Sequence, residues 1–470
     1  MNEYRPYECC GVTPRMMTRR DLLRTVSAGF GWLAFQSLAT QSAAAEASRS
    51  PLAPKSPTLP ARAKRVIFLC MQGGPAHMDT FDYKPKLGED SGKPGVAKGG
   101  GSKLFGSPFC FSQQGRSGLW ISELFPNVAK HADELCLLRG MHTDIPNHPQ
   151  AFVQLHTGSA QFVRPSMGAW MLYGLGTENE NLPGFVTISP PLALGGAQNY
   201  GSAFLPAVFQ GTRIGSQKAD TGEMTIGNTR NEDLPLALQR KQLDLVQAMN
   251  RDLLAGASAN PEVEGVIESY ELAFRMQTEL PKVMDVAAES RATLAMYGIG
   301  EGITNDFGRQ CLMARRFAEA GVRFIEVCHA GWDQHTNLKN KISANCAATD
   351  KPIAALLTDL RSRGLLKDTL VLWGGEFGRT PDSRRADGRD HNAKGYTMWL
   401  AGGGAKGGIS YGGTDDYGYK AVENPVHIHD LHATMLSLLG LDHERLTYRY
   451  AGRDFRLTDV SGNVVKEIMA

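Results

Sequence analysis

The chain has 470 residues, and its 50 basic and 48 acidic residues give a formal net charge of +2. Such a near-neutral total offers no basic stripe to displace counterions from phosphates, so we do not expect nucleic acid as a partner. The length exceeds the roughly 100–200 residues of an ordinary domain, but large α/β enzymes often fold as one elaborated domain, which is what we expect here.

The N-terminal 45 residues have the three-part layout of a twin-arginine export signal. Arg19 and Arg20 precede a weakly apolar run at 26–39, and a small-residue stretch ends at Ala45. The run is shorter than the roughly 20 apolar residues that cross a bilayer, so no stable membrane span is expected. We predict cleavage after Ala45, export by the twin-arginine machinery, and a periplasmic or secreted location. The alternative is a buried N-terminal helix that follows a basic patch.

The next segments predict where the folded domain begins and ends. Residues 46–63 are rich in Pro, Ser and Ala and are typical of a flexible leader. Residues 64–460 form the predicted domain, and 461–470 a C-terminal tail. The domain opens with a continuous apolar run at 65–71, which stops at a Gly-Gly-Pro turn. Such a run is typical of a parallel strand buried on both faces.

The rest of the chain alternates between strand-like and helix-like patterns. Residues 84–118 predict a surface excursion, and long helical periodicity over about 230–297 predicts a helical insertion. Further strands are predicted at 134–138, 185–188, 322–328, 369–373 and 396–401, with helices at 306–320, 346–363 and 430–439. This rhythm predicts an α/β fold with a mostly parallel sheet sandwiched by helices.

Six cysteines remain after the predicted cleavage, and most are typical of a reduced core. Cys70, Cys311 and Cys328 lie in apolar runs, where a buried thiol is the expected state. The one pairing that merits a test as a disulfide is Cys110 with Cys136. No Cys-x-x-Cys spacing indicates a thiolate zinc site.

Acidic residues and histidines follow the predicted strands at the points where the strands end. Parallel strands bring these loops to one edge of the sheet, so we expect a shared site there. Imidazole and carboxylate donors together suit a divalent metal, zinc first, with calcium or manganese as alternatives. Taken singly, each motif is also typical of a surface hydrogen-bonding pair. The candidates are His77, Asp79, His148, Asp333, His335, Glu376, Asp390 and His391.

Four stretches, VIFLCMQGGPAHMDTFDYKP, GVRFIEVCHAGWDQHTN, TLVLWGGEFGRTP and GRDHN, carry a resemblance to a known family. They resemble the secreted proteins called domain of unknown function 1501, a family that is itself similar to the alkaline phosphatase and sulfatase superfamily. The resemblance covers nearly all of residues 64–460. It implies that Asp333 and His335 match the superfamily's first metal site, that His391 matches its later lone histidine, and that Glu376 stands where an Asp ligand belongs.

The sequence departs from the superfamily's pattern at three positions. Gln72 follows the first strand where an acidic ligand is expected, so Asp79 or His77 would have to substitute. Phe377 replaces a neighbouring His or Asn ligand. The position that matches the sulfatase nucleophile is His148, which could ligate a metal or form a phospho-histidine.

Three other residues are candidates for catalysis. Thr80 and Thr143 could replace the missing nucleophile, although a threonine beside an aspartate is commonly only a helix cap. Arg379 could bind an oxyanion through its fork of donors, or it could form a structural ion pair with a nearby aspartate.

These features favour an exported, metal-dependent hydrolase of phosphate or sulfate esters, acting on a small molecule or a glycan, polysaccharides included. A metal-activated water would serve as the nucleophile, since no Ser, Thr or Cys occupies the usual position. Asp333, His335 and His391 would hold one ion, and Glu376 with Asp79 or His148 would hold or adjoin a second. The alternative is a non-catalytic, metal-stabilised binding protein for anionic glycans or for other exported partners.

Overall fold

The computed structural model describes residues 50–95, 101–215, 234–255, 261–383 and 387–470. The predicted export signal and the start of the predicted leader lie outside these residues. In the described part of the leader, Leu52 is buried, and the Lys55 and Leu59 amides donate hydrogen bonds to the Leu175 and Gly440 carbonyl oxygens. Residues 51–63 therefore lie against the domain.

One mixed sheet forms the centre of the domain. Its strands follow the order β14-β5-β13-β9-β1-β8-β6-β7, and β17 pairs with β5. Every pairing is parallel except those of β13, which runs antiparallel to both β5 and β9. The strands are β1 (Arg65–Met71), β5 (Leu135–His142), β6 (Phe185–Ile188), β7 (Thr212–Ile214), β8 (Phe324–His329), β9 (Thr369–Gly374), β13 (Tyr396–Ala401), β14 (Ile409–Tyr411) and β17 (Val426–His427).

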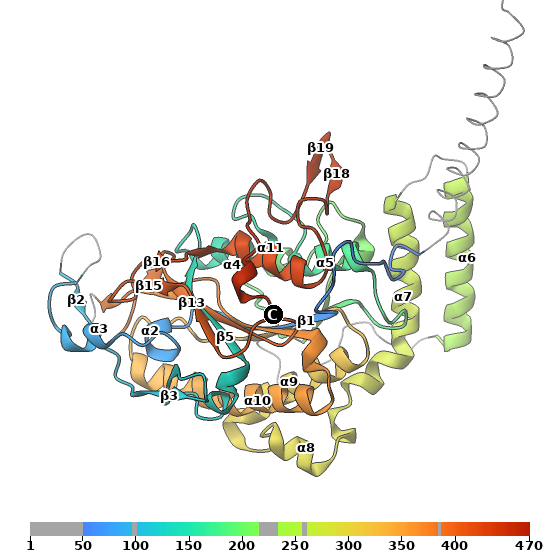
Figure 1. The fold of residues 1–470 in the computed structure, drawn as a ribbon. Coiled ribbons are helices and arrows are strands. Elements are labelled where there is room, and N and C mark those ends of the chain that lie inside the picture. Colours follow the sequence, from blue (N-terminus) through green and yellow to red (C-terminus); the bar gives the residue numbers. More distant parts are fainter. Residues whose placement is uncertain (1–49, 96–100, 216–233, 256–260, 384–386) are drawn as a thin grey trace, which may run out of the picture. The chain divides into compact units, whose positions relative to one another are not determined.

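Helices cover both faces of this sheet (Figure 1). On one face lie α4 (His148–Thr157), α5 (Met167–Leu175) and α11 (Ile428–Leu438). On the other lie α9 (Asn305–Glu319) and α10 (Leu338–Ser362). The predicted α/β fold, a mostly parallel sheet sandwiched by helices, is confirmed.

The segment predicted as a helical insertion contains α6 (Leu236–Ala255), α7 (Pro261–Met284) and α8 (Arg291–Met296). Among the described residues, no helix combines the length and apolar character needed to cross a membrane. Shorter elements are α2 (His77–Thr80), α3 (Pro85–Glu89) and the ladder strands β2 (Lys103–Leu104), β3 (Phe111–Gln114), β4 (Leu119–Ser122), β10 (Gly378–Arg379), β11 (Asp382–Ser383), β12 (His391–Asn392), β15 (Gly413–Thr414), β16 (Ala421–Glu423), β18 (Tyr448–Tyr450) and β19 (Arg453–Phe455).

The central strands consist of apolar residues because they are covered on both faces. All seven residues of β1 and all six of β9 are buried. In the register of the sheet, Cys70 on β1 lies opposite Cys328 on β8 and Gly374 on β9. The carboxyl ends of three neighbouring strands therefore coincide, and the loops that follow them leave the sheet at one edge.

The structure corrects two expectations. The helix predicted at 346–363 begins eight residues earlier, at Leu338 of α10. The disulfide between Cys110 and Cys136 is wrong: both thiols are free, and Cys136 is buried inside β5 while Cys110 is exposed. A core-facing strand residue cannot meet a surface residue without backbone movement.

Candidate metal centre

Four side chains meet beyond the carboxyl ends of β1, β8 and β9, and we call them the outer cluster: His148, Asp333, His335 and His391. His148 is the first residue of α4, Asp333 and His335 follow β8, and His391 lies on β12. All three imidazoles approach one atom, Asp333 Oδ1, which lies 3.2 Å from His148 Nε2, 3.0 Å from His335 Nε2 and 3.3 Å from His391 Nε2. The two Nε2 atoms of His335 and His391 are 2.9 Å apart.

Each of these imidazoles has its other nitrogen occupied by an oxygen acceptor. His148 Nδ1 lies 2.5 Å from Glu376 Oε1, His335 Nδ1 lies 3.1 Å from Asp390 Oδ1, and His391 Nδ1 lies 2.9 Å from the Pro146 carbonyl oxygen. These oxygens accept hydrogen bonds, so Nδ1 donates in each case, and the Nε2 atom of a neutral ring is then free to bind a metal. Metal-binding histidines are oriented by their outer partners in this way.

The spacing of His148, Asp333 and His391 fits three ligands of one metal ion, because one donor atom from each lies within 4.8 Å of the other two. Bonds of about 2.0–2.1 Å in a tetrahedron place the donor atoms of a zinc ion roughly 3.3 Å from one another. Asp333 Oδ1 lies 3.2 Å from His148 Nε2 and 3.3 Å from His391 Nε2. The buried His148 Nε2 atom also has no hydrogen-bond partner among the described residues, because its approach to Asp333 lacks hydrogen-bond geometry. The donor set and this unpartnered nitrogen both fit a bound cation.

The pKa values of the cluster reflect its crowded charges. Burial alone would lower the pKa of His148, but the carboxylates of Asp333 and Glu376 outweigh burial and raise the pKa to about 9. Burial also opposes ionisation of Asp333, yet the neighbouring side chains of His148, His391 and Arg379 hold the pKa of that carboxyl well below its usual range. The pKa of His335 is lowered, chiefly by burial. Without a cation, His148 therefore carries a proton that a metal must displace.

Two glycines let the backbone approach closely enough to build this cluster. Gly73 has φ +115°, and a Cβ there would lie 2.6 Å from the Asp333 amide nitrogen. A Cβ on Gly388 would overlap the His335 carbonyl oxygen. Any larger residue at either position would push the ligand loop away, so packing requires both glycines, and the positive φ of Gly73 requires that one by conformation as well.

Glu376 and Arg379 lie beneath the outer cluster, where both are fully buried. Glu376 accepts hydrogen bonds from the Gly73 amide at 3.1 and 3.2 Å and holds His148 from below. Arg379 pairs with Asp333 at 2.6 Å and donates to the carbonyl oxygens of Gly73 and Gly74. The structural ion pair, the second alternative for Arg379, is therefore the one observed.

Phe377, the residue that replaces a ligand of the superfamily pattern, supplies packing instead. Its ring centroid lies 4.7 Å from that of His148 and 4.9 Å from that of His391. The ring is fully buried. An apolar wall at this position fixes the two imidazoles and keeps water from one side of the cluster.

His77 and Asp79 do not join the outer cluster. Asp79 forms a fully buried ion pair with Arg389, with contacts of 2.7 and 3.0 Å. His77 Nε2 lies 2.7 Å from the Gly418 carbonyl oxygen, and its ring is buried. Asp79 already has a complete ionic partner, so neither residue replaces the acidic ligand that Gln72 lacks.

The two threonines considered as nucleophiles are also occupied elsewhere. Thr80 is fully buried, and its hydroxyl donates to the Ala76 carbonyl oxygen at 3.1 Å, within its own helix. The Thr143 hydroxyl donates to Gln154 at 3.0 Å. Neither hydroxyl is directed at the outer cluster by these bonds.

Two contacts of the candidate residues could not be anticipated from the sequence. The Pro146 carbonyl oxygen that orients His391 is a backbone group, which leaves no signal in a pattern of residue types. Arg389 neutralises Asp79 across 310 positions of the chain. In the sequence Arg389 lies directly before Asp390 and His391, which would suggest a place in the outer cluster and not a pairing with Asp79.

A family model described as a protein of unknown function, DUF1501, matches residues 63–469. The chain belongs to this family. No curated protein matches the sequence. The resemblance on which the candidate ligands were assigned is thus confirmed at the level of the family.

Several solved structures share the general arrangement at low identity. The lipoteichoic acid synthase LtaP from Listeria monocytogenes is 11% identical, with a TM-score of 0.37 over 86% of this chain and 78% of its own. The PsFucS1 sulfatase from Pseudoalteromonas sp. is 13% identical, with a TM-score of 0.35 over 82% and 68%. The alkaline phosphatase from the Antarctic bacterium TAB5 is 10% identical, with a TM-score of 0.31 over 74% and 92%. At such values the likeness does not extend to function.

Proposed function

We propose that this DUF1501 protein is an exported, metal-dependent hydrolase of phosphate or sulfate esters. The observation that carries the proposal is the convergence of three Nδ1-anchored imidazoles on the half-exposed carboxylate of Asp333. Arg379 already pairs with this oxygen at 2.6 Å, but three imidazole Nε2 atoms also gather around it, which is the kind of donor arrangement that a divalent cation takes. Three of the four side chains of the outer cluster would hold one ion and leave the fourth coordination position to water or substrate, with zinc as the best match to the donor set.

A divalent ion in this position supplies Lewis-acid polarisation of an ester oxygen and acidifies water. The residues of the chain arrange the rest. Glu376 and Asp390 fix the tautomers of His148 and His335, and Arg379 holds Asp333 from the buried side. We assign Arg379 to positioning Asp333 rather than to binding the anion, because its guanidinium is fully buried and its donors are taken.

The exposure of the ligands allows a substrate to approach. The Asp333 side chain is 44% exposed and the His335 side chain 31%. A closed structural zinc site would have neither, since such sites use all four protein ligands out of reach of solvent. The outer cluster therefore fits a catalytic role better than a structural one.

A cavity of about 420 Å³ lies beside the loop that leads into α4 and fits a sugar-bearing substrate. Asp144 lines it, together with Phe162, Arg164 and Arg456. An exposed aromatic ring can pack on a pyranose, and arginines can pair with a charged substituent. We therefore place glycan esters among the substrates to test.

The test combines metal analysis with ester assays on the full chain. Bound metals are measured by mass spectrometry, and aryl phosphate and aryl sulfate esters are assayed for the native protein and for His335→Ala. The matched control is His131→Ala, because His131 Nδ1 also meets a carboxylate, Glu134, while its Nε2 meets the Thr358 hydroxyl instead of a ligand group. We expect His335→Ala to lose metal and turnover, and His131→Ala to keep both.

Two other outcomes would contradict the proposal in different ways. Metal that binds stoichiometrically without turnover of any ester would favour the non-catalytic binding protein. No metal and no turnover, with several divalent ions added in turn, would remove the metal centre altogether.

A further inference from the structure

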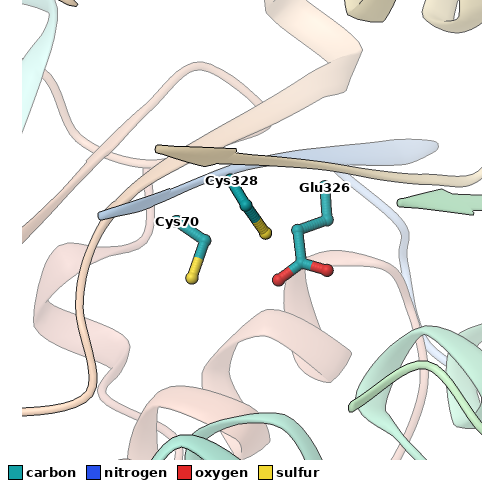
Figure 2. A group of neighbouring side chains, drawn as sticks. All are labelled: Cys70, Glu326 and Cys328. Carbon is teal, nitrogen blue, oxygen red and sulfur yellow. The ribbon is translucent and has the colours of Figure 1, made fainter. Parts of the chain in front are cut away.

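A second group of metal-ligand side chains lies inside the sheet, apart from the outer cluster. Cys70 on β1 lies opposite Cys328 on β8, and Glu326 lies two residues before Cys328 on the same face of its strand. All three are buried, with exposed fractions of 0, 3 and 1%. One sulfur or oxygen atom from each lies within 4.8 Å of the other two. Figure 2 shows the three side chains on one side of the two strands, with their ends directed into the same space.

His156, on the helix that covers this face, is the ionic partner of Glu326. Its Nε2 atom lies 2.5 Å from Glu326 Oε1, and its Nδ1 donates to the Phe152 carbonyl oxygen at 2.7 Å. The Thr187 hydroxyl donates to the other oxygen of Glu326 at 2.7 Å. The imidazole is thus oriented through Nδ1, as each imidazole of the outer cluster is, and its Nε2 faces the carboxylate.

Both oxygens of Glu326 have hydrogen-bond partners, but its burial still carries a cost that a bound cation would offset. A carboxylate and an imidazole taken out of water lose their hydration, and their ion pair only partly offsets that loss. A single buried cysteine packs as a small apolar residue. Two cysteines in register beside a carboxylate form instead a set of sulfur and oxygen donors that zinc takes in proteins.

We propose that Cys70, Glu326 and Cys328 bind a second divalent metal ion at a structural site and that His156 orients Glu326; we call these four residues the inner cluster. Sulfur donors favour zinc over calcium, magnesium or manganese. The ligands come from the protein and all are buried, so a substrate cannot reach the ion. This site does not depend on the proposed hydrolase activity.

Burial also determines how the inner ion would enter and leave. No ligand of the inner cluster exceeds 3% exposure, so the ion must enter while the chain folds. It would link β1 and β8 in the core. The outer cluster is half-exposed and can exchange its ion in the folded protein. A chelator should therefore remove the outer ion and leave the inner one.

Cobalt distinguishes the two sites by spectroscopy. The full chain is produced in medium that contains Co²⁺, dialysed against a chelator, and examined for residual cobalt and for thiolate-to-cobalt charge-transfer absorption in the near ultraviolet. Of the two sites, only the inner cluster has sulfur donors. We expect the native protein and His335→Ala to keep a chelator-resistant ion and the charge-transfer band, and Cys328→Ser to lose the band.

Cys311→Ala serves as the matched control, because Cys311 is equally buried but belongs to neither cluster. It should keep both the ion and the band. If Cys328→Ser does not fold, the native protein decides alone: a folded chain without a chelator-resistant ion and without the band would overturn the inner site. Loss of ester hydrolysis in His335→Ala with the band intact would uphold both sites independently.

Discussion

The outer and inner clusters both pair imidazole with carboxylate, at different depths of the molecule, and of the two only the inner cluster contains thiols. In both, imidazoles held through Nδ1 meet a carboxylate, and α4 contributes one histidine to each: His148 at its first residue and His156 eight residues later, about 12 Å along the axis. The difference is exposure. Asp333 is 44% exposed, whereas Glu326 is 1% exposed. A substrate can reach the exposed outer cluster, whereas the buried inner cluster can only stabilise the core.

The same substitution at the two depths should have very different effects on stability. His156→Leu leaves the buried Glu326 without its ionic partner, which costs about 3–5 kcal/mol of unfolding free energy. His335 contacts two carboxylates, Asp333 and Asp390, that water also reaches. His335→Leu should therefore cost less than about 1 kcal/mol of unfolding free energy. Urea unfolding of both variants measures the difference. Equal losses would contradict the distinction between the clusters.

The double variant His156→Leu with Glu326→Leu provides the control. Removing both charges eliminates the unpaired carboxylate, so most of the stability lost in His156→Leu should return. If it does not, packing rather than charge explains the loss.

The backbone under the outer cluster can be tested separately from its side chains. Gly73→Ala introduces a Cβ 2.6 Å from the Asp333 amide at a positive φ, while Gly92→Ala has a similar φ of +88° and no atom within 4 Å. The first should cost about 1–3 kcal/mol more than the second, since only the first adds a clash. Unfolding free energies measure this cost. Gly73→Ala should also weaken the outer metal and leave the inner one in place.

The sequence predicted the outer cluster better than the inner one for a physical reason. Asp333, His335 and His391 follow strand ends, where the loops of a parallel sheet must meet, so their position along the chain implied their proximity. Asp79 met the same criterion, but a buried arginine from a distant loop neutralised it. Pairings of that kind depend on loop paths that no local pattern encodes.

One feature of the sequence indicates the inner cluster, a charged residue within an apolar strand. Cys70 and Cys328 were expected as buried thiols, and they are buried. Glu326 interrupts an otherwise apolar strand at a position that faces the core, and a charged residue there requires a partner. Its partner, His156, lies on a helix that the sequence patterns did not predict, so only the structure joined the two.

The more deeply a carboxylate that orients an outer histidine is buried, the more it should contribute to the metal affinity of the outer cluster. Glu376→Gln replaces the fully buried, charged acceptor of His148 with a neutral amide oxygen, and Asp390→Asn does the same to the acceptor of His335, which is 51% exposed. Loss of such partners typically costs about 10–100-fold in metal affinity. We expect the loss of metal affinity to lie near the upper end of this range for Glu376→Gln and near the lower end for Asp390→Asn. Metal titration of the two variants measures it. The reverse order would show that burial does not govern the outer cluster.

Acid should weaken α4, the helix that the two clusters share, through His432 on α11. Burial lowers the pKa of His432 to about 3, and its Nε2 donates to the Leu155 carbonyl oxygen of α4 at 2.8 Å. Because the folded pKa lies below the unfolded value of roughly 6.5, this histidine contributes stability above pH 6.5 that is lost as the pH falls towards 3. Between pH 6.5 and 5.5 the native protein should lose up to about 1.4 kcal/mol more than His432→Leu, which has no such group to protonate. Urea unfolding at the two pH values measures this difference. Equal losses of unfolding free energy in the native protein and in His432→Leu would show that protonation of His432 does not weaken the contact between α11 and α4.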